Sequence, residues 1–254
     1  MGDKKKKSLL IFDFDKTIID DDSYGHVILK TLTKEELQNI FDRRYENWVD
    51  GYNYSLKQIK YHGKTKEDFD KMLNELSLTK GMADLFSYIK AQKNNYDSII
   101  LSCGYDYVIK YILKKFNISN VFLDIICNPS RDANPDETDQ FIYVMKKKPH
   151  DCDKCNPCSC KNNEFKEFSS THDMNNYDKI IFICDGYNDI CLAKNLGKND
   201  VTLARKNFAF HKSIDENNLI KDFNCKVDFW ENGNEIINYL KSFEWNIVII
   251  IKCF

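Results

Sequence analysis

The feature that most constrains the fold is a run of apolar residues that stops abruptly at two carboxylates. Residues 9–15 read LLIFDFD, so that aliphatic residues and Phe12 are followed by Asp13 and Asp15. A short continuous apolar run of this kind is consistent with a strand that is buried on both faces. Such strands occur mainly in parallel sheets. The sequence therefore predicts a buried parallel strand whose carboxyl end presents Asp13 and Asp15.

Strand and helix patterns alternate along most of the chain beyond residue 80. Apolar runs that predict strands are YDSIILS (96–102), VFLDIIC (121–127), FIYVM (141–145), KIIFIC (179–184) and VTLA (201–204). Helical spacing of apolar residues predicts helices over 82–89, 105–116, 189–196 and 235–243. This alternation indicates an α/β fold with a doubly wound, mostly parallel sheet. The apolar tail, residues 245–254, is expected to add an edge strand or to pack in a groove.

Residues 23–79 interrupt the alternation with helical patterns only. Thr33 with Glu36, and Thr65 with Asp68, match the capping box that begins many helices, and apolar residues at helical spacing follow each pair. We therefore expect a core formed by residues 1–22 and 80–254, and a small helical insert formed by residues 23–79. Trp48, at helical spacing within the insert, is expected to belong to the insert's own core.

Charge and hydropathy exclude several classes of partner. Lys and Arg total 37 and Asp and Glu total 39, so the net charge is −2 and no basic field favours nucleic acid. The apolar stretch 247–251 is much shorter than the roughly 20 residues of a membrane-spanning helix. The basic N-terminal segment lacks the apolar core of a secretory signal. We expect a cytoplasmic protein that acts on a small molecule, with neither a nucleic acid nor a membrane as partner.

Polar side chains follow three of the predicted strands. Asp13 and Asp15 follow the first, Ser102 ends the second, and Asp185 and Asp189 follow a later one. Ligands of α/β sheets bind beyond the carboxyl ends of the strands, so these side chains are expected to share one pocket. Carboxylates gathered in one pocket repel one another unless a hard divalent cation such as Mg²⁺ binds them. One carboxylate can then attack phosphorus while a second transfers protons.

The motifs resemble those of the haloacid-dehalogenase-like phosphatases. FDFDKTI (12–18), LSCG (101–104), Lys161 and DGYND (185–189) follow one another in the order of the four motifs of that family. The resemblance implies a Rossmann-like core with a helical cap in the C1 position, and hydrolysis through an aspartyl-phosphate. It assigns Asp13 as nucleophile, Asp15 as general acid/base, Thr17, Ser102 and Lys161 to the substrate phosphate, and Asp13, Asp15, Asp185 and, through a metal-bound water, Asp189 to Mg²⁺.

A closer resemblance covers residues 8–243. FDFDKTIIDDDS (12–23), KGMADLF (80–86), HDCDKCNPCSCK (150–161), DGYNDIC (185–191) and KNDVTLARK (198–206) resemble the eukaryotic subgroup of phosphoethanolamine/phosphocholine phosphatase and pyridoxal-phosphate phosphatase. The chain departs from that pattern at Tyr24 and Cys103, where the subgroup implies acidic residues, and at Cys184, where it implies glycine. The missing acids would face a cationic amine, and Tyr24 can stack on a pyridine ring.

We therefore expect a phosphoric monoester hydrolase that favours pyridoxal 5′-phosphate, with Tyr24 and Cys103 as determinants of specificity. Phosphoethanolamine or phosphocholine hydrolysis, and phosphotransfer on the same core, remain alternatives. A zinc-stabilised interaction module with an inert core is a rival from another class, but the intact Asp13, Asp15, Lys161 and Asp185 argue against it.

Cysteines gather in one short segment directly before Lys161. The resemblance implies that His150, Cys152, Cys155 and Cys160 are shared with the subgroup, whereas Cys158 is additional here. In a chain without a secretory signal such a cluster indicates metal rather than disulfides. Four nitrogen and sulfur ligands suffice for one closed tetrahedral zinc site, which would hold the loop that delivers Lys161. The alternative is a reduced, packed loop without metal.

Overall fold

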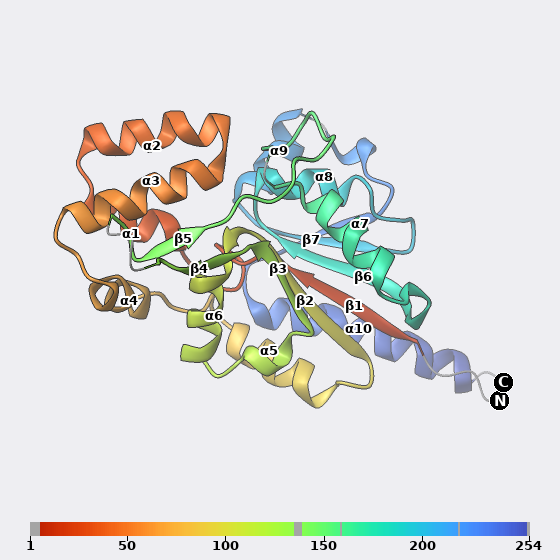
Figure 1. The fold of residues 1–254 in the computed structure, drawn as a ribbon. Helices are drawn as coiled ribbons and strands as arrows, with labels where there is room; N and C mark the ends of the chain where they lie inside the picture. The colour runs from red at the N-terminus through yellow and green to blue at the C-terminus, as the bar shows by residue number, and fades with distance from the viewer. Residues whose placement is uncertain (1–5, 135–138, 158, 218, 253–254) are drawn as a thin grey trace.

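A six-stranded, wholly parallel sheet forms the centre of the molecule. The computed structural model describes residues 6–134, 139–157, 159–217 and 219–252. The strand order is β3-β2-β1-β6-β7-β8 (Figure 1). The strands are β1 (Lys7–Phe12), β2 (Tyr96–Tyr105), β3 (Asp124–Asn128), β6 (Tyr177–Cys184), β7 (Val201–Arg205) and β8 (Lys226–Trp230). The expected doubly wound α/β class is confirmed.

The central strand β1 packs against apolar side chains on both faces of the sheet. Leu10 and Phe12 belong to one buried cluster, and Leu9 and Ile11 belong to a second. Successive side chains of a strand point to opposite faces of the sheet. All four are fully buried, because both faces are covered by apolar residues. A strand covered on both sides must be apolar throughout, which explains the uninterrupted run that begins the sequence motif.

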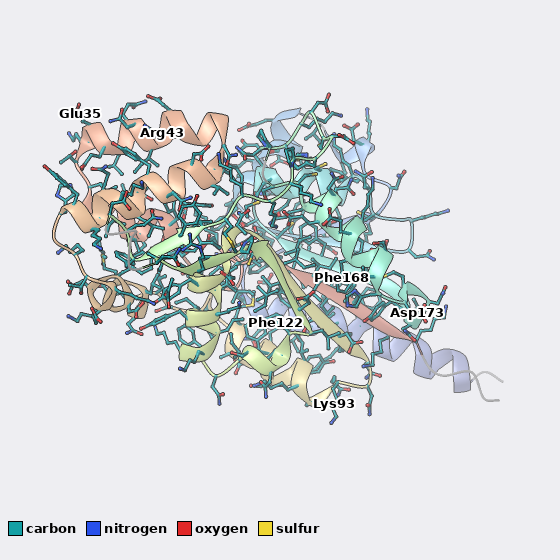
Figure 2. The ribbon with its side chains drawn as sticks, viewed as in Figure 1. Glu35, Arg43, Lys93, Phe122, Phe168 and Asp173 are labelled. Carbon is teal, nitrogen blue, oxygen red and sulfur yellow. The ribbon has the colours of Figure 1, made fainter. Side chains whose placement is uncertain are left out.

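Helices cover both faces of the sheet. On one side lie α5 (Met82–Ala91), α6 (Asp106–Lys115) and α10 (Gly233–Lys252), and on the other lie α7 (Lys161–Thr171), α8 (Ile190–Ala193) and α9 (Ala209–Asn217). Phe122 and Phe168, labelled in Figure 2, belong to the two separate clusters. No helix in the described ranges is both long and apolar enough to cross a membrane.

Four helices form a separate group beyond the carboxyl ends of the strands (Figure 1). They are α1 (Ser23–Thr31), α2 (Lys34–Glu46), α3 (Trp48–Tyr61) and α4 (Lys66–Asn74). Both expected capping boxes are present, at Thr33 with Glu36 and at Thr65 with Asp68. The chain enters and leaves this group at one place, because Ile19 forms an isolated antiparallel bridge with Leu78.

A short hairpin from the later part of the chain packs against this helical group. Strands β4 (Ser130–Asp132) and β5 (Ile142–Val144) pair antiparallel and form a second, two-stranded sheet. The amide of Asn53 in α3 exchanges two hydrogen bonds of 2.8 and 2.9 Å with the backbone of Val144. Residues assigned to the core by sequence therefore contact the insert directly.

Some predicted elements differ in the structure. The run 141–145 does form a strand, but β5 pairs with β4 in a separate two-stranded sheet and is not part of the six-stranded one. The tail does not add an edge strand, because helix α10 continues through it to Lys252. The residues after Gly233 include neither Pro nor Gly, so nothing in this stretch interrupts the helix. Trp48 does not continue the helix that begins at the Thr33 capping box, since Asn47 ends α2 and caps α3 by accepting from the backbone N–H of Val49.

Helix α10 approaches α5 so closely that only glycine fits between them. The N–H of Gly233 donates to the Lys80 carbonyl at 2.8 Å, and a Cβ on Gly233 would lie 2.3 Å from the carbonyl oxygen of Gly81. We expect Gly233→Ala to lower the free energy of unfolding in urea by about 3 kcal/mol, because backbone must shift to admit the methyl group. Gly63→Ala is the control, since Gly63 has a positive φ but open space around it, and we expect a loss of about 1 kcal/mol. Equal losses would contradict the steric argument.

Candidate active site

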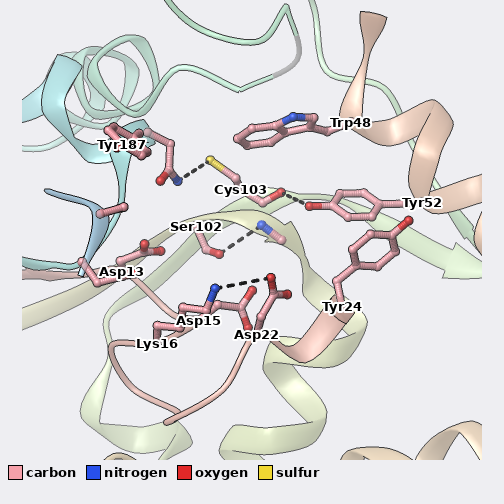
Figure 3. Close-up of a pocket in the computed structure, with 15 residues that line it drawn as sticks. Asp13, Asp15, Lys16, Asp22, Tyr24, Trp48, Tyr52, Ser102, Cys103 and Tyr187 are labelled. Carbon is pink, nitrogen blue, oxygen red and sulfur yellow. Dashed lines mark hydrogen bonds and ion pairs between the residues drawn. The ribbon is translucent and has the colours of Figure 1, made fainter. Parts of the chain in front are cut away.

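A cavity lined by candidate carboxylates lies at the point where the chain switches from one half of the sheet to the other. Strand β1 is flanked by β2 and β6, and such switch points are where doubly wound sheets bind ligands. The cavity has a volume of about 350 Å³, within the usual range for small-molecule sites of about 300–1,000 Å³. Asp13, Asp15, Ser102 and Asp185 all line it, as the sequence predicted (Figure 3 shows the first three).

Lys161 lies behind Asp13 and not on the cavity wall. It is the first residue of α7 and is fully buried, and its Nζ lies 2.8 Å from Asp13 Oδ1 and 2.5 Å from Asp189 Oδ1. Burial by itself would lower the pKa of Lys161, but the carboxylates of Asp13 and Asp189 raise that pKa well above its usual value. The lysine is therefore a permanent buried cation that holds two carboxylates in place.

The carboxylates outnumber the cation that faces them. Oxygens of Asp13, Asp185 and Asp189 lie within 4.8 Å of one another, and all three residues are buried. Burial, followed by the neighbouring Asp13 and Asp189, raises the pKa of Asp185 to about 9. Burial likewise raises the pKa of Asp189 to about 6, although Lys161 opposes the rise. A cluster of hard oxygen ligands whose negative charge is so poorly compensated fits a divalent cation such as Mg²⁺.

Thr17 and Asp189 support this cluster from outside the cavity. The Thr17 hydroxyl donates to Asp185 Oδ1 at 3.3 Å, and Thr17 does not line the cavity, so its contact with substrate phosphate stays a prediction. Asp189 Oδ2 accepts hydrogen bonds from the backbone N–H groups of Asp185 and Gly186 at 3.2 and 2.7 Å. These bonds close the turn that directs Asp185 toward Asp13.

Asp15 has the environment of a proton-transfer group. Its Oδ1 accepts a hydrogen bond of 2.9 Å from the backbone N–H of Ser23, at the start of α1. Burial, followed by the nearby charge of Asp22, raises the pKa of Asp15 to about 7. A carboxyl group with a pKa near neutrality can both donate and accept a proton at physiological pH.

The loop between Asp13 and Ser23 is held by an arginine that the sequence analysis missed. Arg205, at the end of β7, donates to the Lys16 carbonyl at 2.6 Å and also pairs with Asp20. Lys16 has a φ of 56°, so the backbone turns sharply just after Asp15. The piece KNDVTLARK, which carries the resemblance, was the signal available for Arg205.

Ser102 and Cys103 line the cavity from β2. Ser102 is buried, and its Oγ accepts a hydrogen bond of 3.0 Å from the N–H of Gly104. Strand β2 continues through Ser102 to Tyr105 rather than ending at the serine. Burial raises the pKa of Cys103 to about 12, so its thiol remains neutral and does not replace a carboxylate.

Aromatic side chains form the wall opposite the carboxylates (Figure 3). Tyr24 and Tyr52 pack edge to face with their ring centroids 4.7 Å apart, and the Tyr52 hydroxyl donates to the Cys103 carbonyl at 3.1 Å. Trp48 and Tyr187 also line the cavity. Trp48 packs against the buried cluster that contains the core of the insert, as expected, and it also reaches the cavity, which its helical spacing did not predict. Sequence periodicity gave no signal for Tyr52 or Tyr187.

The cysteine cluster differs from its predicted composition. The four sulfur atoms that gather are those of Cys152, Cys155, Cys160 and Cys191, and all lie within 4.8 Å of one another. His150 is not a member, since its Nε2 donates to the Asn156 carbonyl and its Nδ1 accepts from the Cys152 N–H. Cys158 lies outside the described residues.

Known proteins resemble the chain over nearly its whole length. Residues 8–243 match a family described as Putative Phosphatase. Pyridoxal phosphate phosphatase PHOSPHO2 from Bos taurus is 32% identical over 243 residues, which cover 92% of this chain and 98% of that protein. Phosphoethanolamine/phosphocholine phosphatase from Homo sapiens is 24% identical over 242 residues, covering 92% and 88%.

A solved structure resembles the fold. A phospho-aspartyl intermediate analogue of phosphoserine phosphatase superposes with a TM-score of 0.58 at 17% identity, covering 92% of this chain and 99% of that one. Its sequence identity is too low to carry more than the fold, but the family match and the bovine relative extend through the carboxylate motifs. The chain therefore belongs to the putative phosphatase family of haloacid-dehalogenase-like phosphatases, together with pyridoxal phosphate phosphatase and phosphoethanolamine/phosphocholine phosphatase.

Proposed function

We propose that this protein is a Mg²⁺-dependent phosphatase that hydrolyses pyridoxal 5′-phosphate through an aspartyl-phosphate. The observation that carries the proposal is a cavity with Asp13 and Asp15 on one side and aromatic rings on the other. Phosphoryl transfer needs the carboxylates of Asp13 and Asp15, and a flat pyridine ring packs well against the aromatic rings. Relatives named pyridoxal phosphate phosphatase cover almost the whole chain, which supports the same substrate.

Asp13 and Asp15 divide the chemistry between them. In the first step an oxygen of Asp13 attacks phosphorus, and Asp15 gives its proton to the departing alcohol oxygen. In the second step Asp15 takes a proton from water, whose oxygen attacks phosphorus, so that inorganic phosphate leaves and Asp13 is regenerated. Ser102 lines the cavity where it can bind a phosphoryl oxygen, and the buried charge of Lys161 offsets negative charge that develops near Asp13.

The fit of the carboxylate cluster to Mg²⁺ supports a metal in this reaction. Asp13, the Asp15 carbonyl and Asp185 would hold the ion, and Asp189 would orient a water bound to it. Mg²⁺ bound there supplies positive charge that offsets the carboxylates and the phosphoryl oxygens.

Residues 23–79 form a cap over the catalytic carboxylates in this proposal. Tyr24, Trp48 and Tyr52 reach the cavity from helices α1 and α3, while the carboxylates come from the strands. A cap that supplies one wall of the site excludes water and limits access to small phosphates. Phosphoproteins and nucleic acids are therefore poor substrates.

Phosphoethanolamine or phosphocholine is the second candidate substrate, because Asp22 also lines the cavity. A carboxylate is a suitable partner for an ammonium group, although Asp22 already lies 3.8 Å from the Lys16 ammonium. Lys16 and Asp22 offset each other's charge, which leaves the aromatic wall as the feature that selects the substrate. Phosphotransfer to a sugar would use the same carboxylates and differs only in the acceptor.

A comparison of kcat/KM values for the three phosphates tests the proposal. We expect pyridoxal 5′-phosphate to exceed phosphoethanolamine and phosphocholine by about tenfold or more, an effect of about 1.4 kcal/mol in transition-state binding. Tyr24→Asp should lower the value for pyridoxal 5′-phosphate by about tenfold, since the ring is lost and a charge is added. Tyr24→Phe keeps the ring and should preserve the preference.

Tyr61→Asp is the matched control, because Tyr61 is 83% exposed on α3 and does not line the cavity. It should leave all three kcat/KM values unchanged. A tenfold preference of the wild type for phosphoethanolamine or phosphocholine would overturn the choice of substrate. Rapid phosphoryl transfer to an added sugar, with little release of phosphate, would instead favour the phosphotransferase.

A further inference from the structure

Four thiols from two distant parts of the chain meet at one point beside the active site. Cys152, Cys155 and Cys160 come from the irregular segment before α7, and Cys191 comes from α8. Cys191 Sγ lies 3.8 Å from both Cys152 Sγ and Cys160 Sγ. Cys160 is fully buried and the other three are partly buried. Such proximity of four thiols needs a physical reason, because each is a poor hydrogen-bond partner for the others.

The sulfur spacing matches a shared metal ion better than a disulfide. A disulfide requires its sulfurs about 2.05 Å apart. Four sulfurs placed tetrahedrally around Zn²⁺ at about 2.3 Å lie about 3.8 Å from one another. The two distances made by Cys191 equal that value.

We propose that Cys152, Cys155, Cys160 and Cys191 bind one structural Zn²⁺, separate from the Mg²⁺ of the catalytic site. Soft thiolates select zinc, whereas the hard carboxylate cluster around Asp13 selects magnesium. Four protein ligands leave no open coordination position, so this ion binds no substrate or water. The proposal depends on the sulfur geometry alone and holds whatever substrate the carboxylates act on.

His150 positions the loop and is not a ligand. Its Nε2 donates to the Asn156 carbonyl at 2.8 Å, and its Nδ1 accepts from the Cys152 N–H at 3.2 Å. Both ring nitrogens are therefore used by backbone groups, and neither has a lone pair free for a metal. Cys191 supplies the fourth ligand instead, and it comes from a helix rather than from the cysteine-rich segment.

The metal would connect the two segments that carry the buried ion pair. Cys160 directly precedes Lys161, and Cys191 lies two residues beyond Asp189, while Lys161 Nζ and Asp189 Oδ1 are 2.5 Å apart. The described residues between Met145 and Cys160 form neither a helix nor a strand, and they contain one isolated bridge, between Asn156 and Ser159. A long irregular segment of this kind is costly to order without a crosslink. Zinc would provide that crosslink and fix Lys161 relative to Asp189.

Zinc content of the full-length protein, purified without chelator and then reduced, incubated with Zn²⁺ and desalted, tests the proposal. We expect about one zinc per chain in the wild type, and a loss of most of it in Cys191→Ser, because three thiolates hold the metal more weakly. His150→Ala should retain about one zinc, since the imidazole is not a ligand. Cys127→Ser is the matched control, as Cys127 is buried in β3 and absent from the cluster, and it should also retain the metal.

X-ray absorption at the zinc edge of the wild type keeps the proposal testable if Cys191→Ser fails to fold. We expect four sulfur neighbours at about 2.3 Å and no nitrogen at 2.0–2.1 Å. A wild type that takes up no zinc overturns the proposal and leaves a packed, reduced loop. Zinc retained in Cys191→Ser, or a shell with three sulfurs and one nitrogen together with loss of zinc in His150→Ala, overturns the ligand set.

Discussion

Asp13→Asn is expected to lower kcat for phosphatase activity by about 10³-fold or more, which corresponds to about 4 kcal/mol of lost transition-state stabilisation. The physical reason is that an amide is a far weaker nucleophile than a carboxylate and brings less charge to a metal. The measurement is steady-state hydrolysis of p-nitrophenyl phosphate and of pyridoxal 5′-phosphate at saturating Mg²⁺. Rapid quench in acid adds a direct readout, since the wild type should carry a phosphoryl group on the protein and Asp13→Asn should carry none.

The matched control is Asp21→Asn, on the same loop. Asp21 is exposed and does not line the cavity, so its removal should change kcat by less than about twofold. Thermal unfolding of both variants shows whether either has lost its fold. Equal activity of Asp13→Asn and the wild type would remove Asp13 as nucleophile. An Asp13→Asn protein that still accumulates a phosphoryl group would place the nucleophile elsewhere.

The strands that position the site could be predicted because each is buried on both faces. Strands β1 and β6 are nearly continuous apolar runs, and their carboxyl ends meet at one edge of the sheet, so Asp13 and Asp185 had to lie close together. Strand β8 was missed because it mixes Lys226 and Asp228 with apolar residues, as an edge strand exposed on one side does. Its pairing with β7 depends on tertiary structure and cannot be read from the local sequence pattern.

The remaining parts of the site depend on contacts between residues far apart in the sequence. Arg205 binds the Lys16 carbonyl across 189 positions, and Cys191 joins Cys160 across 31. His150 was predicted as a zinc ligand because it lies close in the sequence to several cysteines. Spacing in the sequence does not determine which way a side chain points, and both ring nitrogens of His150 bind backbone groups instead. The contact of Trp48 with the cavity was missed for a related reason, since the direction of this side chain depends on the helix break at Asn47.

Lys161→Met is expected to lower kcat/KM by about 10²- to 10³-fold, because it removes the charge that faces Asp13 and the developing charge on phosphorus. The same change leaves Asp13, Asp185 and Asp189 buried without their cation, so the Mg²⁺-free protein should lose about 3–5 kcal/mol of unfolding free energy. The neighbouring lysine repels a metal, so the variant should bind Mg²⁺ more tightly than the wild type does. Urea unfolding with and without Mg²⁺, and calorimetric titration, measure these effects.

Tighter Mg²⁺ binding separates an electrostatic role of Lys161 from simple damage to the fold, because a damaged site would bind the metal more weakly. Lys147→Met is the matched control, since Lys147 forms a 2.6 Å ion pair with Glu164 of the same helix α7 and does not line the cavity. Its removal should leave kcat/KM within about twofold and Mg²⁺ affinity unchanged. If Lys161→Met kept wild-type activity, the buried ammonium would serve only to balance charge in the folded chain. If both variants lost activity equally, the effect would belong to the placement of α7 and not to the cation between Asp13 and Asp189.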